Sequence, residues 1–225
     1  MLPERSNNMA VLSASILSCN PAYIGPQVEE AMKSGAGAIH VDVMDGYYVS
    51  NMTFGPALIR ALAEITDAPI SVHLEVGNPD VIAPLFYDTP CQSIVFQMDS
   101  CHNPIHLIRQ IKAAGKKAGV GVGPAFGIDT VRHVIHHLDE IVIMSVEPGY
   151  AGQPFEASVY EKLETFREMA EKAGVRVEVG VDGGVNAANT QKLVAAGTDV
   201  LICGSALFNG NISANVERLL NSYQG

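Results

Sequence analysis

Positive charge is scarce in this sequence. Of its 225 residues only 14 are Lys or Arg, against 24 Asp or Glu, which gives a net charge of -10 and a pI near 5.1. Proteins that bind duplex nucleic acid concentrate Lys and Arg on one face, whereas here they are scattered. We therefore expect no nucleic-acid partner.

Long apolar runs and paired cysteines are also missing. No apolar stretch reaches the roughly 20 residues that a membrane-spanning helix needs, so we expect no membrane association. The four cysteines form no C-x-x-C pair and match no zinc-ribbon spacing. Met9–Ser18 is apolar, but the segment before it contains Glu4 and a single Arg, which makes a poor secretion signal. These features predict a protein of the reducing cytoplasm.

Short runs rich in β-branched residues alternate with amphipathic segments along the chain. The candidate strands are Val11–Leu17, Ala38–Met44, Pro69–Val76, Ser93–Met98, Lys117–Gly123, Glu140–Val146, Val175–Asp182 and Val200–Cys203. The helical segments include Pro56–Ile65, Ile105–Ala114, Thr130–Leu138, Phe155–Lys172, Asn189–Ala196 and Ala214–Tyr223. Glycines 35, 115, 174 and 197 stand where helices should end before strands. This alternation predicts βαβ units and a parallel sheet.

Eight strand–helix units are the number found in an α/β protein with a closed (β/α)8 TIM barrel. An open, doubly wound sheet is the alternative architecture. We predict a loose N-terminal tail at residues 1–9 and a single barrel domain over residues 10–225. Because such barrels carry their functional groups at the carboxyl ends of the strands, the polar residues there are the candidates for chemistry.

Two histidines and two aspartates should point into the barrel at that end. Side chains alternate between the two faces of a strand, so His40 and Asp42 point inward while the neighbouring valines face the helices. The same alternation turns His73 and Asp182 inward. The alternative is that each group is a separately hydrogen-bonded core residue, but one divalent cation would satisfy all four buried groups. The mixed donor set suits zinc, iron(II), manganese or cobalt better than calcium.

Glycine-rich loops follow the last three candidate strands. They contain Gly149 and Gly152, then Gly183-Gly184, then Gly204-Ser205. Loops after the seventh and eighth strands of such barrels often bind phosphate, and backbone N–H groups with a helix N-terminus can hold it without a cation. The alternative is that these glycines only form tight turns. We expect no Lys or Arg at this end, which also excludes a Schiff-base lysine.

A metal beside two carboxylates permits proton transfer next to a carbonyl. The metal polarises a ketone and its neighbouring hydroxyl, and an inward carboxylate removes the proton between them. The result is an enediolate, to which a second carboxylate can return a proton with inverted configuration. Asp42 and Asp182 come from distant strands and could flank a phosphorylated sugar. No G-x-G-x-x-G motif follows the first strand, so no redox cofactor is expected.

The sequence resembles the ribulose-phosphate 3-epimerase family from Val11 to Phe208. The matching stretches are Ser15–Ser18, His40–Gly46, Val72–Leu74, Met144–Val146 with Pro148-Gly149, Val181–Gly184 and Gly204–Ala206. The resemblance implies a phosphate-binding barrel with one divalent metal, often zinc or iron. The implied metal ligands are His40, Asp42, His73 and Asp182, and Asp42 and Asp182 are also the implied acid/base groups. The implied substrate contacts are Ser15, Met44, Met144, Gly149, Gly152, Gly183, Gly184, Gly204 and Ser205.

The reaction implied by this resemblance interconverts D-ribulose 5-phosphate and D-xylulose 5-phosphate, a step of the pentose phosphate pathway. We also expect self-association, which is common among such barrels. Two alternatives stay open: a 3-epimerase of another ketose phosphate such as allulose 6-phosphate, and a non-catalytic paralogue that binds a sugar phosphate. The presence of both Asp42 and Asp182 argues against the paralogue, because binding alone needs no pair of opposed acids.

Five positions near the expected mouth depart from the family pattern, while the four metal positions match it. They are Glu75 for Met, Gln97 for His, Gly123 for Asn, Glu147 for Asn or Asp, and Gly180 for Glu. One interpretation is that the proton transfer is kept and the substrate pocket is altered. The other is neutral drift within the same activity.

Overall fold

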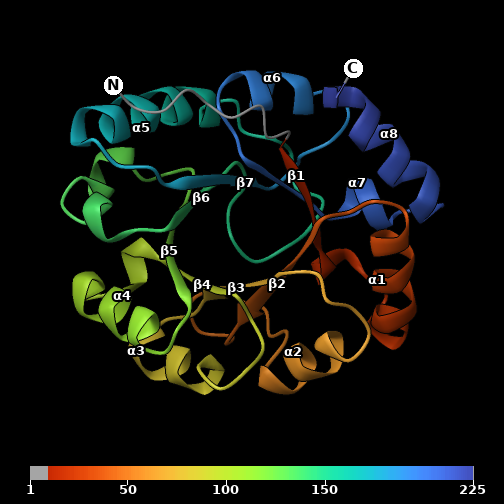
Figure 1. The fold of residues 1–225 in the computed structure, drawn as a ribbon, viewed down its shortest axis with the longest axis horizontal. Helices are drawn as coiled ribbons and strands as arrows, with labels where there is room; N and C mark the ends of the chain where they lie inside the picture. Colours follow the sequence, from red (N-terminus) through yellow and green to blue (C-terminus); the bar gives the residue numbers. More distant parts are fainter. Residues whose placement is uncertain (1–9, 225) are drawn as a thin grey trace.

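Eight parallel strands close into a barrel in the computed structural model, which describes residues 10–224 (Figure 1). The strands are β1 (Val11–Ser15), β2 (Ala38–Met44), β3 (Ile70–Glu75), β4 (Ser93–Gln97), β5 (Lys117–Val122), β6 (Glu140–Met144), β7 (Glu178–Asp182) and β8 (Val200–Cys203). Each strand pairs with its neighbours in sequence, and β8 pairs with β1. The TIM-barrel prediction is confirmed and the open sheet is wrong. The tail expected at residues 1–9 lies outside the described residues.

Helices surround the barrel on all sides (Figure 1). They are α1 (Ile24–Lys33), α2 (Pro56–Ala63), α3 (Pro79–Ile82), α4 (Pro104–Ala113), α5 (Val159–Ala173), α6 (Thr190–Ala195), α7 (Ser205–Phe208) and α8 (Ile212–Gln224). Pro56, Pro79 and Pro104 each begin a helix, where the missing N–H costs no intrahelical bond. Within residues 10–224, none of the helices has the length and apolar character needed to span a bilayer.

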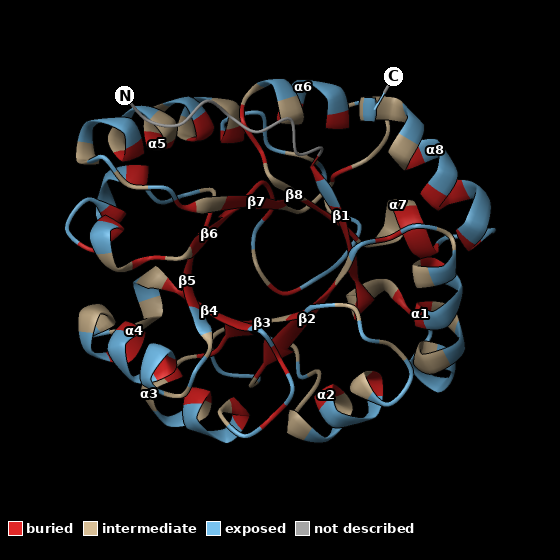
Figure 2. Ribbon diagram, in the orientation of Figure 1, coloured by how far each residue is buried: buried red, intermediate tan, exposed pale blue. Residues whose placement is uncertain are grey.

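The main hydrophobic core lies between the strands and the helices, so the strands are buried and the outer helix faces are exposed (Figure 2). Inside the barrel there is a smaller apolar cluster of Val95, Val142, Met144 and Ile202. Many of the other inward positions carry buried polar groups, among them His40, Asp42 and His73. The alternation of strand side chains therefore divides the molecule into an apolar outer core and a barrel interior that mixes polar and apolar groups.

The four glycines expected at helix ends all have positive φ angles, between 66° at Gly174 and 111° at Gly35. Their position is confirmed, because the left-handed region favours glycine. After Gly174 the N–H of Val175 still donates to the carbonyl of Ala170 in the last turn of α5. For this reason β7 starts at Glu178 rather than at Val175, where the sequence predicted it.

One predicted helix is wrong. The segment Thr130–Leu138 contains two 3-10 turns, η5 (Ile128–Val131) and η6 (Ile135–His137), instead of one amphipathic helix. The apolar face is buried as expected, but the N–H of Val134 bonds to Val131 three residues earlier. Four of the six residues from Thr130 to Ile135 are β-branched, which lowers helix propensity, so the segment packs its apolar face through tighter, shorter turns.

Candidate active site

Four side chains that could hold a metal ion meet inside the barrel near the carboxyl ends of the strands. His40 and Asp42 come from β2, His73 from β3 and Asp182 from β7, and their ligand atoms all lie within 4.8 Å of one another. His40 Nε2 is 3.1 Å from Asp42 Oδ1 and 3.3 Å from His73 Nδ1. His40 Nε2 also lies 3.8 Å from Asp182 Oδ2. The structure thus brings together the four residues that strand alternation turned inward.

The strand register explains this convergence. Asp42 on β2 and His73 on β3 are directly paired across the two strands, so their inward side chains are neighbours. Ser15 at the end of β1 donates a hydrogen bond from Oγ to Asp42 Oδ2 at 3.0 Å. This bond fixes the Asp42 carboxylate and directs its other oxygen toward the two imidazoles.

The geometry of this cluster fits a metal ion. Asp42 Oδ1 is buried and has no hydrogen-bond partner within residues 10–224, although imidazole nitrogens lie 3.1 and 3.4 Å away. Those nitrogens are close but not aligned to donate. Two neutral imidazoles and two carboxylates are the donor set of borderline divalent cations such as zinc or iron(II). The cluster could therefore hold a divalent metal ion.

Burial and mutual charge separate the acidities of these groups. Burial raises the pKa of Asp182 to about 7, with a further increase from the charge of Asp42. Burial alone would also raise the pKa of Asp42, but the charges of the nearby His40 and His73 imidazoles lower it below its usual range. The same pairing with Asp42 overcomes the effect of burial on His40 and raises its pKa to about 9. Without a metal, the site thus has one ionised carboxylate and one that titrates near neutrality.

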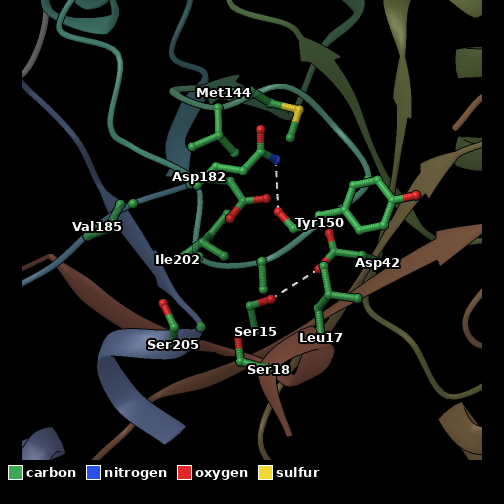
Figure 3. A pocket seen from close by; sticks show the side chains of 18 of the residues that line it. Ser15, Leu17, Ser18, Asp42, Met144, Tyr150, Asp182, Val185, Ile202 and Ser205 are labelled. Atoms are coloured by element: carbon green, nitrogen blue, oxygen red, sulfur yellow. Dashed lines mark hydrogen bonds between the residues drawn. The ribbon is translucent and has the colours of Figure 1, made fainter. Parts of the chain in front are cut away.

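A pocket opens above this cluster. Asp42, Asp182, Met144 and Glu75 are among its lining residues. The predicted substrate contacts that line it are Ser15, Met144, Gly149, Gly152, Gly183, Gly184, Gly204 and Ser205. Met44 is buried and does not line it. Figure 3 shows Ser205 and Val185 on one side of this pocket and Asp42 on the opposite side.

The loop between β6 and α5 crosses the opening of the barrel (Figure 1). Two hydrogen bonds hold it to the loop after β2: Asn51 Nδ2 donates to the Gly149 carbonyl at 2.8 Å, and Tyr150 Oη donates to the Ser50 carbonyl at 2.6 Å. Within the loop, Gln153 Nε2 donates to the Tyr150 carbonyl at 2.8 Å. The loop therefore forms a braced cover over one side of the pocket.

The loops after β7 and β8 form the side of the pocket opposite β3. Gly183 has a φ of 102°, and a Cβ there would come within 2.5 Å of Val146 Cγ2. Gly204 is equally constrained, since a Cβ would meet Ser18 Oγ at 2.5 Å. Ser18 Oγ is itself buried with no hydrogen-bond partner in the described part of the chain. Glycine thus leaves backbone and one free hydroxyl facing this end of the pocket.

Lysine and arginine are absent from the residues that line this pocket within the described chain. One expectation nevertheless needs correction, because a cation does reach the carboxyl ends of the strands. Lys162 in the first turn of α5 donates to the carbonyls of Gly123 and Pro124, both at 2.7 Å, just after β5. Its ammonium group fastens a loop and does not face the pocket.

Sequence reasoning missed several contacts around the site. Gln97 Nε2 lies 3.2 Å from His73 Nε2, although Gln97 was singled out only as a departure from a pattern. Its place two residues after the inward Val95 was the available signal. The roles of Tyr150 and Gln153 in bracing the loop depend on contacts between distant segments, and no local pattern marks them.

Comparison with known proteins identifies the same family that the sequence motifs resemble. The profile of the Ribulose-phosphate 3 epimerase family matches residues 11–208. The chain is 39% identical over 206 residues to the chloroplastic ribulose-5-phosphate-3-epimerase of Arabidopsis thaliana, covering 90% of this chain and 73% of that protein. It is 36% identical over 201 residues to the ribulose-phosphate 3-epimerase of Bacillus subtilis, covering 89% of this chain and 93% of that protein.

Solved structures with similar folds are more distant in sequence. The Mycobacterium tuberculosis tryptophan synthase structure aligns with a TM-score of 0.72 at 16% identity, covering 98% of this chain and 95% of that one. A thiamine phosphate pyrophosphorylase from Pyrococcus furiosus aligns with a TM-score of 0.62 at 18% identity, covering 97% and 96%. At such low identity these similarities support the barrel fold alone.

Proposed function

This chain belongs to the ribulose-phosphate 3-epimerase family of carbohydrate isomerases, and from that membership we propose that it interconverts D-ribulose 5-phosphate and D-xylulose 5-phosphate. The observation that carries the proposal is the placement of Asp42 and Asp182. Both carboxylates line one pocket and come from β2 and β7, which lie apart in the barrel. A sugar between them can lose a proton on one face and regain it on the other.

His40, Asp42, His73 and Asp182 would hold the divalent metal. When bound, the metal supplies Lewis-acid polarisation of the substrate ketone and its neighbouring hydroxyl. We propose zinc, iron(II), manganese or cobalt, because the set mixes imidazole nitrogen with carboxylate oxygen. Metal analysis of protein purified without added ions distinguishes these four.

Asp42 and Asp182 carry the proton transfer in this proposal. Asp42 and Asp182 line the same pocket from β2 and β7, so each can reach one face of a bound sugar. One carboxylate removes the C3 proton to give the enediolate, and the other carboxyl group donates from the opposite face. The reverse reaction exchanges the two roles. Ser15, through its hydrogen bond to Asp42 Oδ2, keeps that carboxylate oriented.

The glycine loops would bind the phosphate. Gly183, Gly184, Gly204 and Ser205 line the end of the pocket that contains the free Ser18 hydroxyl. Backbone N–H groups and hydroxyls can hold a phosphate dianion without Lys or Arg. Met144 adds an apolar surface beside the carboxylates, and the loop from β6 to α5 shields that region from water.

Deuterium exchange tests the proposed function. Metal-loaded protein is incubated in deuterated water with D-ribulose 5-phosphate, and in parallel with allulose 6-phosphate. We expect deuterium at C3 and formation of D-xylulose 5-phosphate from the pentulose. Faster exchange with the hexulose would favour the second epimerase, and no exchange with any ketose phosphate would favour a binding paralogue.

We also propose a cytoplasmic location and self-association. The four cysteines of the described chain are all free thiols, which suits a reducing compartment. Sedimentation measurements at several protein concentrations test the oligomeric state.

A further inference from the structure

Glu75 is a buried acid at the wall of the pocket that the proposed mechanism does not use. It ends β3, is 1% exposed, and lines the same pocket as Asp42 and Asp182. Gly149, in the loop that crosses the mouth, lines the same pocket, and its backbone N–H lies near the Glu75 carboxylate. Glu75 therefore lies beneath the cover and beside the reaction centre.

One oxygen of this carboxylate has no partner. Glu75 Oε2 is buried and forms no hydrogen bond with any described residue. A buried acceptor without a donor is costly, and a methionine of similar length would avoid that cost. Lys and Arg are absent from the described lining of the pocket, so the missing donor is not a neighbouring cation. The free oxygen is therefore matched to a donor brought by the ligand.

The barrel geometry indicates which part of the ligand carries this donor. In the closed barrel, β3 is four strands from β7 in either direction, and Gly183 and Gly184 follow β7. A ketose phosphate with its phosphate in those glycine loops and its C2 and C3 atoms between Asp42 and Asp182 directs C1 toward β3. The donor attached to C1 in a ketose is its hydroxyl group.

We propose that Glu75 is a specificity residue that accepts a hydrogen bond from the C1 hydroxyl of the ketose phosphate substrate. This inference rests on the proposed function, because it assumes a phosphate at the glycine loops. A carboxyl group accepts from a hydroxyl in either protonation state, so the role does not depend on the charge of Glu75. A methionine thioether is only a weak acceptor and could not replace it.

The test compares two substrates that differ by this hydroxyl alone, D-xylulose 5-phosphate and 1-deoxy-D-xylulose 5-phosphate. Exchange of the C3 proton is measured as kcat/KM for the wild type, Glu75→Met and Glu75→Gln. We expect the wild type to favour the hydroxylated sugar by about 10- to 100-fold, the range for a hydrogen bond to a buried polar group. Glu75→Met should reduce this preference to about threefold or less, and Glu75→Gln, whose amide oxygen still accepts, should keep part of it.

Glu147→Gln is the matched control. Glu147 is a carboxylate on the same pocket, but it is exposed. Its replacement removes one negative charge and should leave the preference for the C1 hydroxyl as in the wild type. If Glu147→Gln lowers the preference as much as Glu75→Met does, the effect is one of general charge and the proposal is wrong.

Two further readouts separate the possible failures. The first is bound metal per chain, which should be equal in the wild type and Glu75→Met. A fall in metal content together with an equal loss of kcat/KM for both sugars would show that Glu75 acts on the metal, and would overturn the proposal.

The second is calorimetric binding of the two sugars. If the wild type epimerises neither sugar, the proposed function fails, but their binding still tests the role of Glu75. A binding ratio unchanged between the wild type and Glu75→Met would then overturn the inference.

Discussion

At the scale of single residues, the site depends on a few polar groups whose partners lie on other strands. Asp42 receives a hydrogen bond from Ser15 on β1 and lies close to His73 on β3. Burial acts to raise the pKa of both aspartates, but the charges of His40 and His73 lower that of Asp42, while the charge of Asp42 raises that of Asp182 further. In the metal-free site, the environment of each carboxylate therefore decides which one is ionised.

Replacing either aspartate by asparagine tests this division of roles. Asp42→Asn and Asp182→Asn keep the size of the side chain but remove its ability to take up or donate a proton. We expect kcat for epimerisation to fall by about a hundredfold to ten-thousandfold in each variant, with the circular dichroism spectrum unchanged. Residual turnover above about a tenth of the wild-type rate in one variant would contradict an acid/base role for that residue.

Gln97 should affect metal affinity through His73. For Nδ1 of His73 to bind a metal, Nε2 must carry the proton and needs an acceptor. The Gln97 amide lies 3.2 Å away and its oxygen is buried without a partner among residues 10–224. Rotating this amide by half a turn exchanges its N and O atoms and supplies the acceptor.

We therefore expect Gln97→Leu to weaken metal binding by about 10- to 100-fold, measured by competition with a chromogenic chelator. Gln97→Glu, which keeps an acceptor at this place, should bind the metal more tightly than Gln97→Leu. Equal affinity of Gln97→Leu and the wild type would show that the contact with His73 does not orient it.

Several residues of the site were predictable because strand alternation fixes which side chains point inward. His40, Asp42, His73 and Asp182 follow from that pattern alone. The burial of Glu140 could not be predicted in this way. As the first residue of a strand it would be expected at a solvent-exposed end, but it is only 8% exposed. The distinction depends on neighbouring strands that enclose it, which no local pattern records.

At the scale of elements, the loops after the strands control access to the site. Most strands and helices were predictable from periodicity. For Thr130–Leu138 the periodicity predicted the buried face correctly, but the backbone forms 3-10 turns and not the expected helix. Periodicity reports which residues are buried; it does not separate an α-helix from successive 3-10 turns when β-branched residues are frequent. The bracing of the loop from β6 to α5 by Asn51 and Tyr150 was equally invisible.

Gly183→Ala tests the loop after β7. Gly183 has a φ of 102°, and an added Cβ would come within 2.5 Å of Val146 at the pocket wall. We expect a loss of about 1–3 kcal/mol in the free energy of unfolding from the strained backbone and a several-fold increase in KM. Urea denaturation and steady-state kinetics measure the two effects.

Gly210→Ala provides the control for that variant. Gly210 has a φ of 89°, but an added Cβ would meet nothing within 4 Å. It should lose stability through the same backbone cost and keep the wild-type KM. If both variants change KM alike, the shape of the loop after β7 does not matter for substrate binding.

At the scale of the whole molecule, a second cavity lies near the amino ends of the strands. Its lining is largely apolar but includes the polar residues Glu140, Ser13, Ser71 and Ser93. Burial and then the charge of Glu178 raise the pKa of Glu140 to about 7, against the lowering effects of Ser93, Lys117 and His40. This carboxyl group should link the stability of the barrel to pH.

Whether stability rises or falls with pH follows from the direction in which the pKa of Glu140 is shifted. Between its ordinary pKa of 4.5 and its folded value of about 7, Glu140 binds a proton in the folded chain and not in the unfolded chain. Rising pH through this window therefore removes stability. The loss from this one group amounts to about 2–3 kcal/mol between about pH 5 and about pH 8.

Glu140→Gln removes this dependence. In metal-free protein, we expect the variant to gain about 2–3 kcal/mol relative to the wild type as pH rises from about 5 to about 8. Urea unfolding of both proteins at several pH values measures the difference. A difference that stays constant across this range would show that Glu140 titrates near its ordinary pKa in the folded barrel.

The closed barrel itself was predictable because eight strand–helix units allow few other arrangements. The exact substrate was not, since it depends on a few pocket residues such as Glu75 whose partners come from other loops.

The most direct test of metal-dependent epimerisation is to remove the metal and follow the C3 proton of D-ribulose 5-phosphate in deuterated water. We predict one divalent ion per chain in the active protein. We also predict loss of deuterium uptake after treatment with a chelator, and recovery when zinc, iron(II), manganese or cobalt is added back. Undiminished exchange by protein shown to be free of metal would contradict a role of the metal in the reaction.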